Sequence, residues 1–245
     1  ENSDGVEVIK DVSFDLSAGE ILGVAGIAGS GQKELCEAIA GLHPIKKGAI
    51  LYKDENIERK TPRELINLGI SMSFIPEDRL GMGLAASLDI TDNMMLKTYA
   101  KGRSPFVDRK SAAETAKRIV KELDIVTPSI STPVRRLSGG NVQKVLLGRE
   151  IDANPKVLIT AYPVRGLDIN SSYTIFNLLN KQKQNGSGIL FIGEDLDVML
   201  ELCDRIMVLC QGRVSGIVKA SEVTKEQLGL MMTHLNESEV ENDAG

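Results

Sequence analysis

The sequence predicts an α/β fold with a mostly parallel sheet, an antiparallel edge sheet and a helical lobe. A short apolar segment, residues 21–25, runs directly into a glycine-rich turn and a helix, which is typical of a strand buried on both faces. Apolar strands at 157–160, 189–192 and 206–209 alternate with helical segments, the order expected of a parallel sheet. From residue 80 to about 153 the helical pattern dominates and predicts the lobe.

The remaining segments fit around this plan. Apolar residues alternate between Val6 and Leu16, which predicts an antiparallel edge strand, and 48–53 and 69–75 are further strands. We expect a three-stranded antiparallel edge beside the glycine-rich turn. Asp108 is predicted to cap a helix with an apolar stripe made of Ala112, Ala116, Ile119, Val120 and Leu123.

Length and composition favour one domain in a reducing compartment. For 245 residues we expect a domain over 1–236, with its helical lobe at about 80–150, and a disordered acidic tail at 237–245. The net charge of −5 argues against nucleic-acid binding, which needs a basic face. The three cysteines lack metal-ligand spacing and are expected to be buried thiols. No apolar run approaches the roughly 18 residues of a membrane span, and a chain that starts at Glu1 without Met is expected to be a segment of a longer one.

The glycine-rich turn has the layout of a phosphate-binding loop. It lies where a strand meets a helix, so backbone N–H groups and the helix N-terminus favour anions. The pattern needs a lysine for the β/γ-phosphates and then Ser or Thr for Mg²⁺, but this chain has Gln32 and Lys33. Gln32 is uncharged, and Lys33 comes one position late, about 100° around the helix. Taken alone, the loop fits a turn that binds nothing equally well; its residues are Gly26, Ile27, Ala28, Gly29, Ser30, Gly31, Gln32 and Lys33.

The strand at 157–160 ends without the carboxylates of a nucleotide-hydrolysis site. An apolar run ending in Asp-Glu would hold Mg²⁺ with the Asp and polarise the attacking water with the Glu. Here Ala161 and Tyr162 stand at those positions, before a proline. The sequence therefore predicts no metal ligands and no catalytic residue of the chain's own. We expect Gly29 and Ala161 to lie at the ends of neighbouring strands.

Residues 137–141, Leu-Ser-Gly-Gly-Asn, open a predicted helix. Ser138 is a natural N-cap, and Gly139 and Gly140 allow a phosphate to approach the backbone closely. An ordinary capped helix is the alternative interpretation. The string lies between the phosphate loop and the altered strand, after a helical lobe, and this order favours a nucleotide-binding role for Ser138, Gly139, Gly140 and Asn141.

With this string the chain, from Val6 to about Leu235, resembles the ATP-binding cassette (ABC) ATPases. It is most similar to the second cassette of the double-cassette ATPases that import simple sugars and nucleosides. The segments that carry the resemblance are 31–35 (Gly-Gln-Lys-Glu-Leu), 75–79 (Ile-Pro-Glu-Asp-Arg), 132–135 (Thr-Pro-Val-Arg), 137–141, 165–168 (Arg-Gly-Leu-Asp) and 194–197 (Glu-Asp-Leu-Asp).

The resemblance implies a head-to-tail dimer of cassettes, in which each ATP lies between one phosphate loop and the other cassette's signature. Asp168 then belongs to the loop that crosses this interface. The implied partners are a second cassette, upstream in the same polypeptide, and transmembrane permease subunits. The implied location is the cytoplasmic side of the cell membrane.

The departures from the family pattern fall in the chain's own ATP site. Glu77 stands where the family has the glutamine that senses Mg²⁺ and the membrane subunit, and Glu194 where it has the switch histidine. No aromatic residue near Ser3 is available to stack on adenine. One missing general base costs about 10²–10⁴ in rate. We therefore expect this domain alone to be inactive, with weak ATP binding in its own site, Mg²⁺ at the partner's site, and ATPase activity only in the assembled transporter.

Two other functions fit parts of the sequence. A soluble, non-transport ABC ATPase of translation or chromosome maintenance would need a long coiled-coil insertion or a basic face, and neither is visible. An active small kinase or GTPase with a phosphate loop is disfavoured by Gln32, Ala161 and Tyr162. The sequence favours a transporter domain whose signature completes a partner's ATP site.

Overall fold

The computed structural model describes residues 5–74, 79–97 and 108–234, in two compact units. Unit 1 comprises Glu1–Met72, Lys156–Tyr162 and Asn180–Gly245, and unit 2 comprises Ser73–Pro155 and Pro163–Leu179. The predicted tail at 237–245 and the predicted site residue Glu77 lie outside the described residues. None of the described helices combines the length and the apolar character that crossing a membrane requires.

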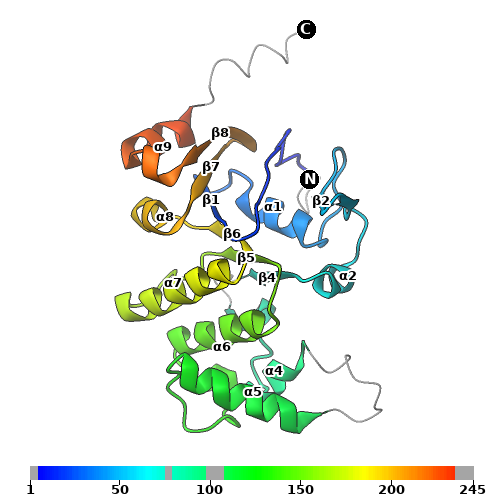
Figure 1. The fold of residues 1–245 in the computed structure, drawn as a ribbon, viewed down its shortest axis with the longest axis vertical. Helices are drawn as coiled ribbons and strands as arrows, with labels where there is room; N and C mark the ends of the chain where they lie inside the picture. Colours follow the sequence, from blue (N-terminus) through cyan, green and yellow to red (C-terminus); the bar gives the residue numbers. More distant parts are fainter. Residues whose placement is uncertain (1–4, 75–78, 98–107, 235–245) are drawn as a thin grey trace. The chain divides into compact units, whose positions relative to one another are not determined.

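Six strands form one sheet, with the order β4-β5-β6-β1-β7-β8 (Figure 1). The pairs β5–β6, β6–β1 and β1–β7 are parallel, and β7–β8 is antiparallel, which confirms the predicted mostly parallel sheet. The strands are β1 (Ile21–Gly26), β4 (Ile70–Phe74), β5 (Val157–Ala161), β6 (Gly188–Ile192), β7 (Arg205–Cys210) and β8 (Arg213–Lys219). In β1, β5, β6 and β7 the middle residues are mostly apolar and all buried, as expected for strands covered on both faces.

The strand order corrects one expectation. Gly29 and Ala161 do not follow neighbouring strands, because β6 lies between β1 and β5. Ile192 of β6 pairs with Val24 on one side and Ala161 on the other. All three strands are short apolar runs, so their sequences alone did not determine which one is central.

Around the sheet of unit 1 lie α1 (Gln32–Ile39), α2 (Pro62–Asn67), α8 (Leu196–Leu202) and α9 (Lys225–Thr233), and a short 3₁₀ turn, Ala220–Glu222, follows β8. The α2 and α9 helices begin with capping boxes at Thr61 and Thr224. Cys36, Cys203 and Cys210 are free and buried, as predicted. Burial raises the pKa of the Cys203 thiol to about 12, so this group stays protonated and unreactive near neutral pH.

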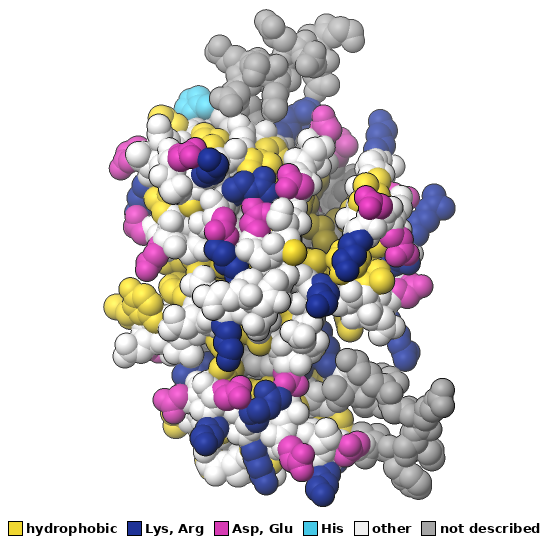
Figure 2. Space-filling view, in the orientation of Figure 1, with side chains coloured by type: hydrophobic (Ala, Val, Ile, Leu, Met, Phe, Trp, Pro, Cys, Tyr) yellow, Lys and Arg dark blue, Asp and Glu magenta, His cyan; other side chains and the backbone are white. Residues whose placement is uncertain are grey.

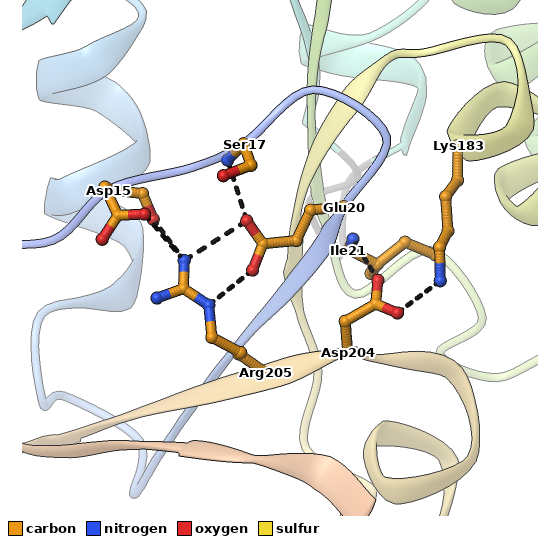
Figure 3. Close-up of polar contacts among 7 residues, drawn as sticks. All are labelled: Asp15, Ser17, Glu20, Ile21, Lys183, Asp204 and Arg205. Carbon is orange, nitrogen blue, oxygen red and sulfur yellow. Dashed lines mark hydrogen bonds and ion pairs between the residues drawn. The ribbon is translucent and has the colours of Figure 1, made fainter.

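A polar cluster fixes the amino ends of β1 and β7 (Figure 3). Arg205 donates to both carboxylate oxygens of Glu20, at 2.5 and 3.2 Å, and to Asp15 at 3.0 Å. Beside this ion pair, Asp204 accepts from the Ile21 backbone N–H at 2.8 Å and from Lys183 at 2.5 Å. These contacts lie at the opposite end of β1 from the glycine-rich loop, so they fix the strand without occupying its carboxyl edge.

The prediction of an edge strand at 6–16 is wrong. The described part of this segment contains no strand, and Asp11 interrupts it in a left-handed conformation with φ 51°. One backbone bond, from Lys10 N–H to Gly212 O at 2.8 Å, ties the segment to the body of unit 1. Instead of a three-stranded edge, β2 (Leu51–Tyr52) and β3 (Glu55–Asn56) form a two-stranded antiparallel hairpin.

Unit 2 is built from helices around its own apolar core. The helices are α3 (Arg79–Met82), α4 (Ile90–Met95), α5 (Arg109–Glu122), α6 (Gly139–Asp152) and the first part of α7 (Ile169–Gln184), with a 3₁₀ turn at Val134–Arg136. Asp108 caps α5 as predicted, accepting a hydrogen bond from Ser111 N–H at 3.0 Å. The core joins side chains of α4, α5 and α6, among them Ile90, Ala116, Ile119, Val142 and Leu146.

Candidate nucleotide site and signature

The loop after β1 has the backbone of a phosphate-binding loop. Gly29 and Gly31 adopt left-handed conformations, with φ of 87° and 104°, which side chains with a Cβ rarely reach. Gly31 is the N-cap of α1, and the Ser30 N–H donates to Ile27 O at 3.0 Å, which closes a tight turn. The loop therefore wraps back over the N-terminus of a helix, where backbone N–H groups and the helix dipole favour an anion.

Gln32 fills the inside of this loop. Its side chain is 3% exposed, and its Nε2 donates to Ile27 O at 3.2 Å. The same Nε2 lies 2.5 Å from where a Cβ on Gly26 would be, so the amide rests against the loop's first glycine. A neutral amide bonded to the loop's own carbonyl stands where the pattern needs a cation for phosphate.

Lys33 does not replace the missing cation. Its side chain is 61% exposed, and its Nζ lies 3.8 Å from Glu37, one turn along α1. Glu37 also faces the Nε2 of His43 at 3.4 Å. The Lys33 ammonium thus lies along the outside of α1, as the rotation of about 100° from position 32 requires.

The other altered positions lie at the same edge of the sheet of unit 1. Ala161 ends β5 with 2% exposure, and Tyr162 follows in a left-handed conformation, φ 51°, with its N–H donating to Ile192 O at 2.8 Å. Glu194 follows β6 at an exposed position, two residues beyond Ile192. Because these strands are parallel and in register, Ala161, Tyr162 and Glu194 come together at the carboxyl edge, where the loop after β1 also begins.

The signature belongs to unit 2, at the start of α6. Ser138 is the N-cap, as predicted, and its Oγ accepts from the Asn141 backbone N–H at 3.4 Å and from Asn141 Nδ2 at 2.9 Å. Asn141 Oδ1 accepts from the Val126 N–H at 3.0 Å, in the loop after α5. Ser138 and Gly139 are exposed, so this end of α6 is open to a ligand.

Asp168 lies next to the signature within unit 2. Ser171 donates to both of its carboxylate oxygens, from the backbone N–H at 2.9 Å and from Oγ at 2.7 Å. These bonds hold the pKa of Asp168 below its ordinary value. The same Ser171 Oγ lies 3.4 Å from where a Cβ on Gly140 would be, so the start of α7 contacts the start of α6.

Sequence reasoning missed Ser171. The signal was present, since Asp168 and Ser171 have the spacing of a helix cap that precedes α7. In the described part of the chain, no cluster of His, Cys, Asp and Glu has the arrangement of a metal site.

A glycine loop between a strand and a helix, at the carboxyl edge of a mostly parallel sheet, defines the class of nucleotide-binding proteins with a phosphate loop. The family model of the ABC transporter matches residues 9–163, well over half of the chain. The chain therefore belongs to the ABC transporter family.

Curated relatives cover almost the whole chain. The guanosine import ATP-binding protein NupO of Bacillus subtilis is 37% identical over 96% of this chain and 46% of its own length. The ribose import ATP-binding protein RbsA 1 of Rubrobacter xylanophilus is 38% identical over 95% of this chain and 47% of its own. The chain thus spans slightly less than half the length of these relatives.

Solved structures show the same fold. A nucleotide-free ATP-binding cassette from an ABC transporter superposes with a TM-score of 0.77, covering 97% of this chain and 93% of that one, at 24% identity. The ABC cassette fold that the sequence predicts is confirmed by this superposition together with the sheet topology.

Proposed function

We propose that this chain is the ATP-binding component of an importer for simple sugars or nucleosides. The observation that carries the proposal is an intact signature, Ser138–Gly140, in a chain whose curated relatives are named for guanosine, ribose, xylose and galactose import. ATP binding at this signature then drives transport through membrane subunits. The location that follows is the cytoplasmic face of the membrane.

The chain's own nucleotide site does not fit Mg-ATP hydrolysis. Its backbone loop suits phosphate, but Gln32 brings no charge, and Ala161 supplies no carboxylate for Mg²⁺. Tyr162 and Glu194 stand at the positions of the base and the switch residue. We infer that this site binds ATP weakly and that the chain contributes no catalytic residue of its own.

The partner is a second cassette with a complete phosphate loop. We place it in the same polypeptide, because the matched relatives are about twice as long as the segment they share with this chain. The resemblance of this chain to a second cassette places the partner upstream. Ser138, Gly139 and Gly140 then face the terminal phosphate of the ATP held by that cassette. Asp168, beside the signature in unit 2, belongs to the same interface.

A soluble ABC ATPase of translation or chromosome maintenance has less support. Figure 2 shows Lys and Arg side chains mixed with Asp and Glu over the described part of the visible face, rather than a basic field. Nucleic-acid binding depends on such a field. The net charge of −5 also argues against nucleic-acid binding. Transport is therefore the function that we propose.

The test compares two substitutions in the assembled importer. Gly139→Asp places a carboxylate at an exposed position against the partner's terminal phosphate, where charge repulsion should abolish ATP hydrolysis and transport. Tyr162→Ala removes no catalytic group and should change hydrolysis less than about twofold, since it alters only the chain's own nucleotide site, which is proposed to be inactive. ATPase rates and substrate uptake are measured in reconstituted vesicles with both variants.

Thermal unfolding of each purified variant checks that the domain remains folded. Equal loss of activity in both variants, or loss with Tyr162→Ala alone, would mean that the chain's own nucleotide site, and not its signature alone, takes part in hydrolysis. Activity that survives Gly139→Asp would remove the signature from the catalytic site.

A further inference from the structure

We propose that Asn141 is a positioning residue that fixes the direction of the Ser138 hydroxyl, so that Ser138 can only donate its proton to a ligand oxygen. The proposal rests on the function proposed above and assigns a role to a side chain next to the ligand-binding part of the signature. It follows from three hydrogen bonds around the start of α6.

The first step fixes the orientation of the Asn141 amide. An amide's oxygen and nitrogen are usually hard to tell apart, and the neighbouring groups decide. A backbone N–H can only donate, so the atom that faces the Val126 N–H at 3.0 Å must be the oxygen, Oδ1. The other end, which faces Ser138 Oγ at 2.9 Å, is therefore the NH₂ group.

The second step follows from the valence of the hydroxyl. A serine hydroxyl has two acceptor lone pairs and one donor proton. Asn141 supplies two donors to Ser138 Oγ, Nδ2 at 2.9 Å and the backbone N–H at 3.4 Å. Both lone pairs are thus engaged, and what remains is the proton, which must point away from Asn141.

The third step concerns the kind of ligand atom that the Ser138 hydroxyl can bind. It is exposed, it caps a helix of 14 residues, and it donates its proton to none of the described residues. A group of this kind binds an oxygen that accepts hydrogen bonds, such as a phosphoryl oxygen, and offers nothing to a ligand donor. Asn141 itself has both amide ends bonded inside unit 2, so it acts through Ser138.

The experiment is a double-mutant cycle on the ATPase rate of the assembled importer as a function of ATP concentration. Ser138→Ala should lower kcat by about tenfold to a hundredfold, the worth of a hydrogen bond to a charged group. Asn141→Leu has a similar volume but no donor, and should lower kcat about threefold because the hydroxyl regains three rotamers. In the Ser138→Ala background, the same Asn141→Leu change should cost less than about 1.5-fold, since no hydroxyl is left to direct.

A second cycle uses Asn141→Asp, which keeps the acceptor for Val126 and replaces the donor by a carboxylate. That carboxylate can accept the Ser138 proton and turn it away from the ligand. Its added charge repels phosphate in both backgrounds and cancels in the cycle, so the cost should still be several-fold larger with Ser138 than with Ala at 138. Thr127→Val is the matched control: Thr127 Oγ1 bonds Ser129 O next to the same loop, and its loss should leave the rate unchanged.

The outcomes separate the two proposals. If Ser138→Ala and Gly139→Asp both leave hydrolysis intact, the proposed function fails. If Ser138→Ala lowers kcat but Asn141→Leu costs the same with and without the hydroxyl, Asn141 has a merely structural role and the inference is overturned. Non-additive losses in kcat, with every single and double variant still folded at the assay temperature, support it.

Discussion

At the scale of single residues, Ser171 sets the pKa and the orientation of the Asp168 carboxylate. It bonds both oxygens of Asp168, and hydrogen bonds to the ionised form stabilise that form. The pKa of Asp168 is accordingly lowered, with the Ser171 side chain as the main cause. An ionised and oriented Asp168 suits a residue proposed to cross an interface between two cassettes.

Ser171→Ala should raise the pKa of Asp168 toward its ordinary value of 3.8. A lowered folded-state pKa contributes stability above the unfolded value and loses it as pH falls through the folded value. The variant should therefore be slightly less stable near neutral pH, and the difference should disappear as the pH falls through the lowered folded-state pKa of Asp168 and the carboxylate is protonated. Carboxyl NMR titration and pH-dependent unfolding measure both effects.

Ser172→Ala is the matched control, because its Oγ bonds the backbone oxygen of Asp168 at 3.1 Å and not the carboxylate. Its Asp168 pKa should equal that of the unaltered protein. A shift of the same size in the two variants would show that the Ser171 hydroxyl has no specific role.

At the scale of elements, α5 and α6 pack tightly at Gly148. A Cβ there would lie 2.5 Å from Ile119 Cγ2 and 3.0 Å from Leu123 Cδ1, both on or next to α5. Close packing of this kind leaves no room for an added methyl group. The contact holds the helix that begins with the signature against the core of unit 2.

Gly148→Ala should destabilise the domain by about 1–3 kcal/mol, because the added methyl forces the two helices apart. Gly229→Ala in α9 should instead stabilise it by up to about 1 kcal/mol, since outside the adjoining helix backbone no described atom lies within 4 Å of the new Cβ, and alanine is the better helix former. Urea unfolding of both variants measures the difference. Stabilisation by Gly148→Ala would contradict the tight contact.

Local signals in the sequence predicted those elements that depend on local chemistry. Ser138 and Asp108 cap helices where the sequence placed them, since a cap is made by the side chain and the next turn. The segment from Val6 to Leu16 alternates like a strand, yet a strand also needs a partner to pair with. Asp11 in a left-handed conformation breaks that pairing, and the alternation carried no sign of it.

At the scale of the whole molecule, strand order could not be predicted, because β1, β5 and β6 are similar apolar runs. What the sequence did predict is that loops at strand ends carry the altered positions, since parallel strands have their carboxyl ends at one edge. It could not predict how Asn141 uses its amide, which depends on the Val126 N–H approaching from the loop after α5.

The carboxyl edge of β1, β6 and β5 carries the altered nucleotide site, and one substitution there can be tested on the isolated domain. Gln32→Lys restores one cation, and a charged hydrogen bond to phosphate is worth about 1.5–3 kcal/mol against about 1 kcal/mol for a neutral one. Calorimetry with Mg-ATP should therefore show about tenfold tighter, still weak binding. A phosphate-release assay should show no turnover above background.

Turnover stays absent because the other two strands remain altered. Ala161 offers no ligand to Mg²⁺, and Tyr162 and Glu194 supply neither the base nor the switch histidine. Gln32→Met, similar in length and uncharged, is the control and should leave binding at or below that of the unaltered domain. Hydrolysis by Gln32→Lys near the rate of a working cassette would show that the lysine alone was missing, and that Ala161, Tyr162 and Glu194 have been misread.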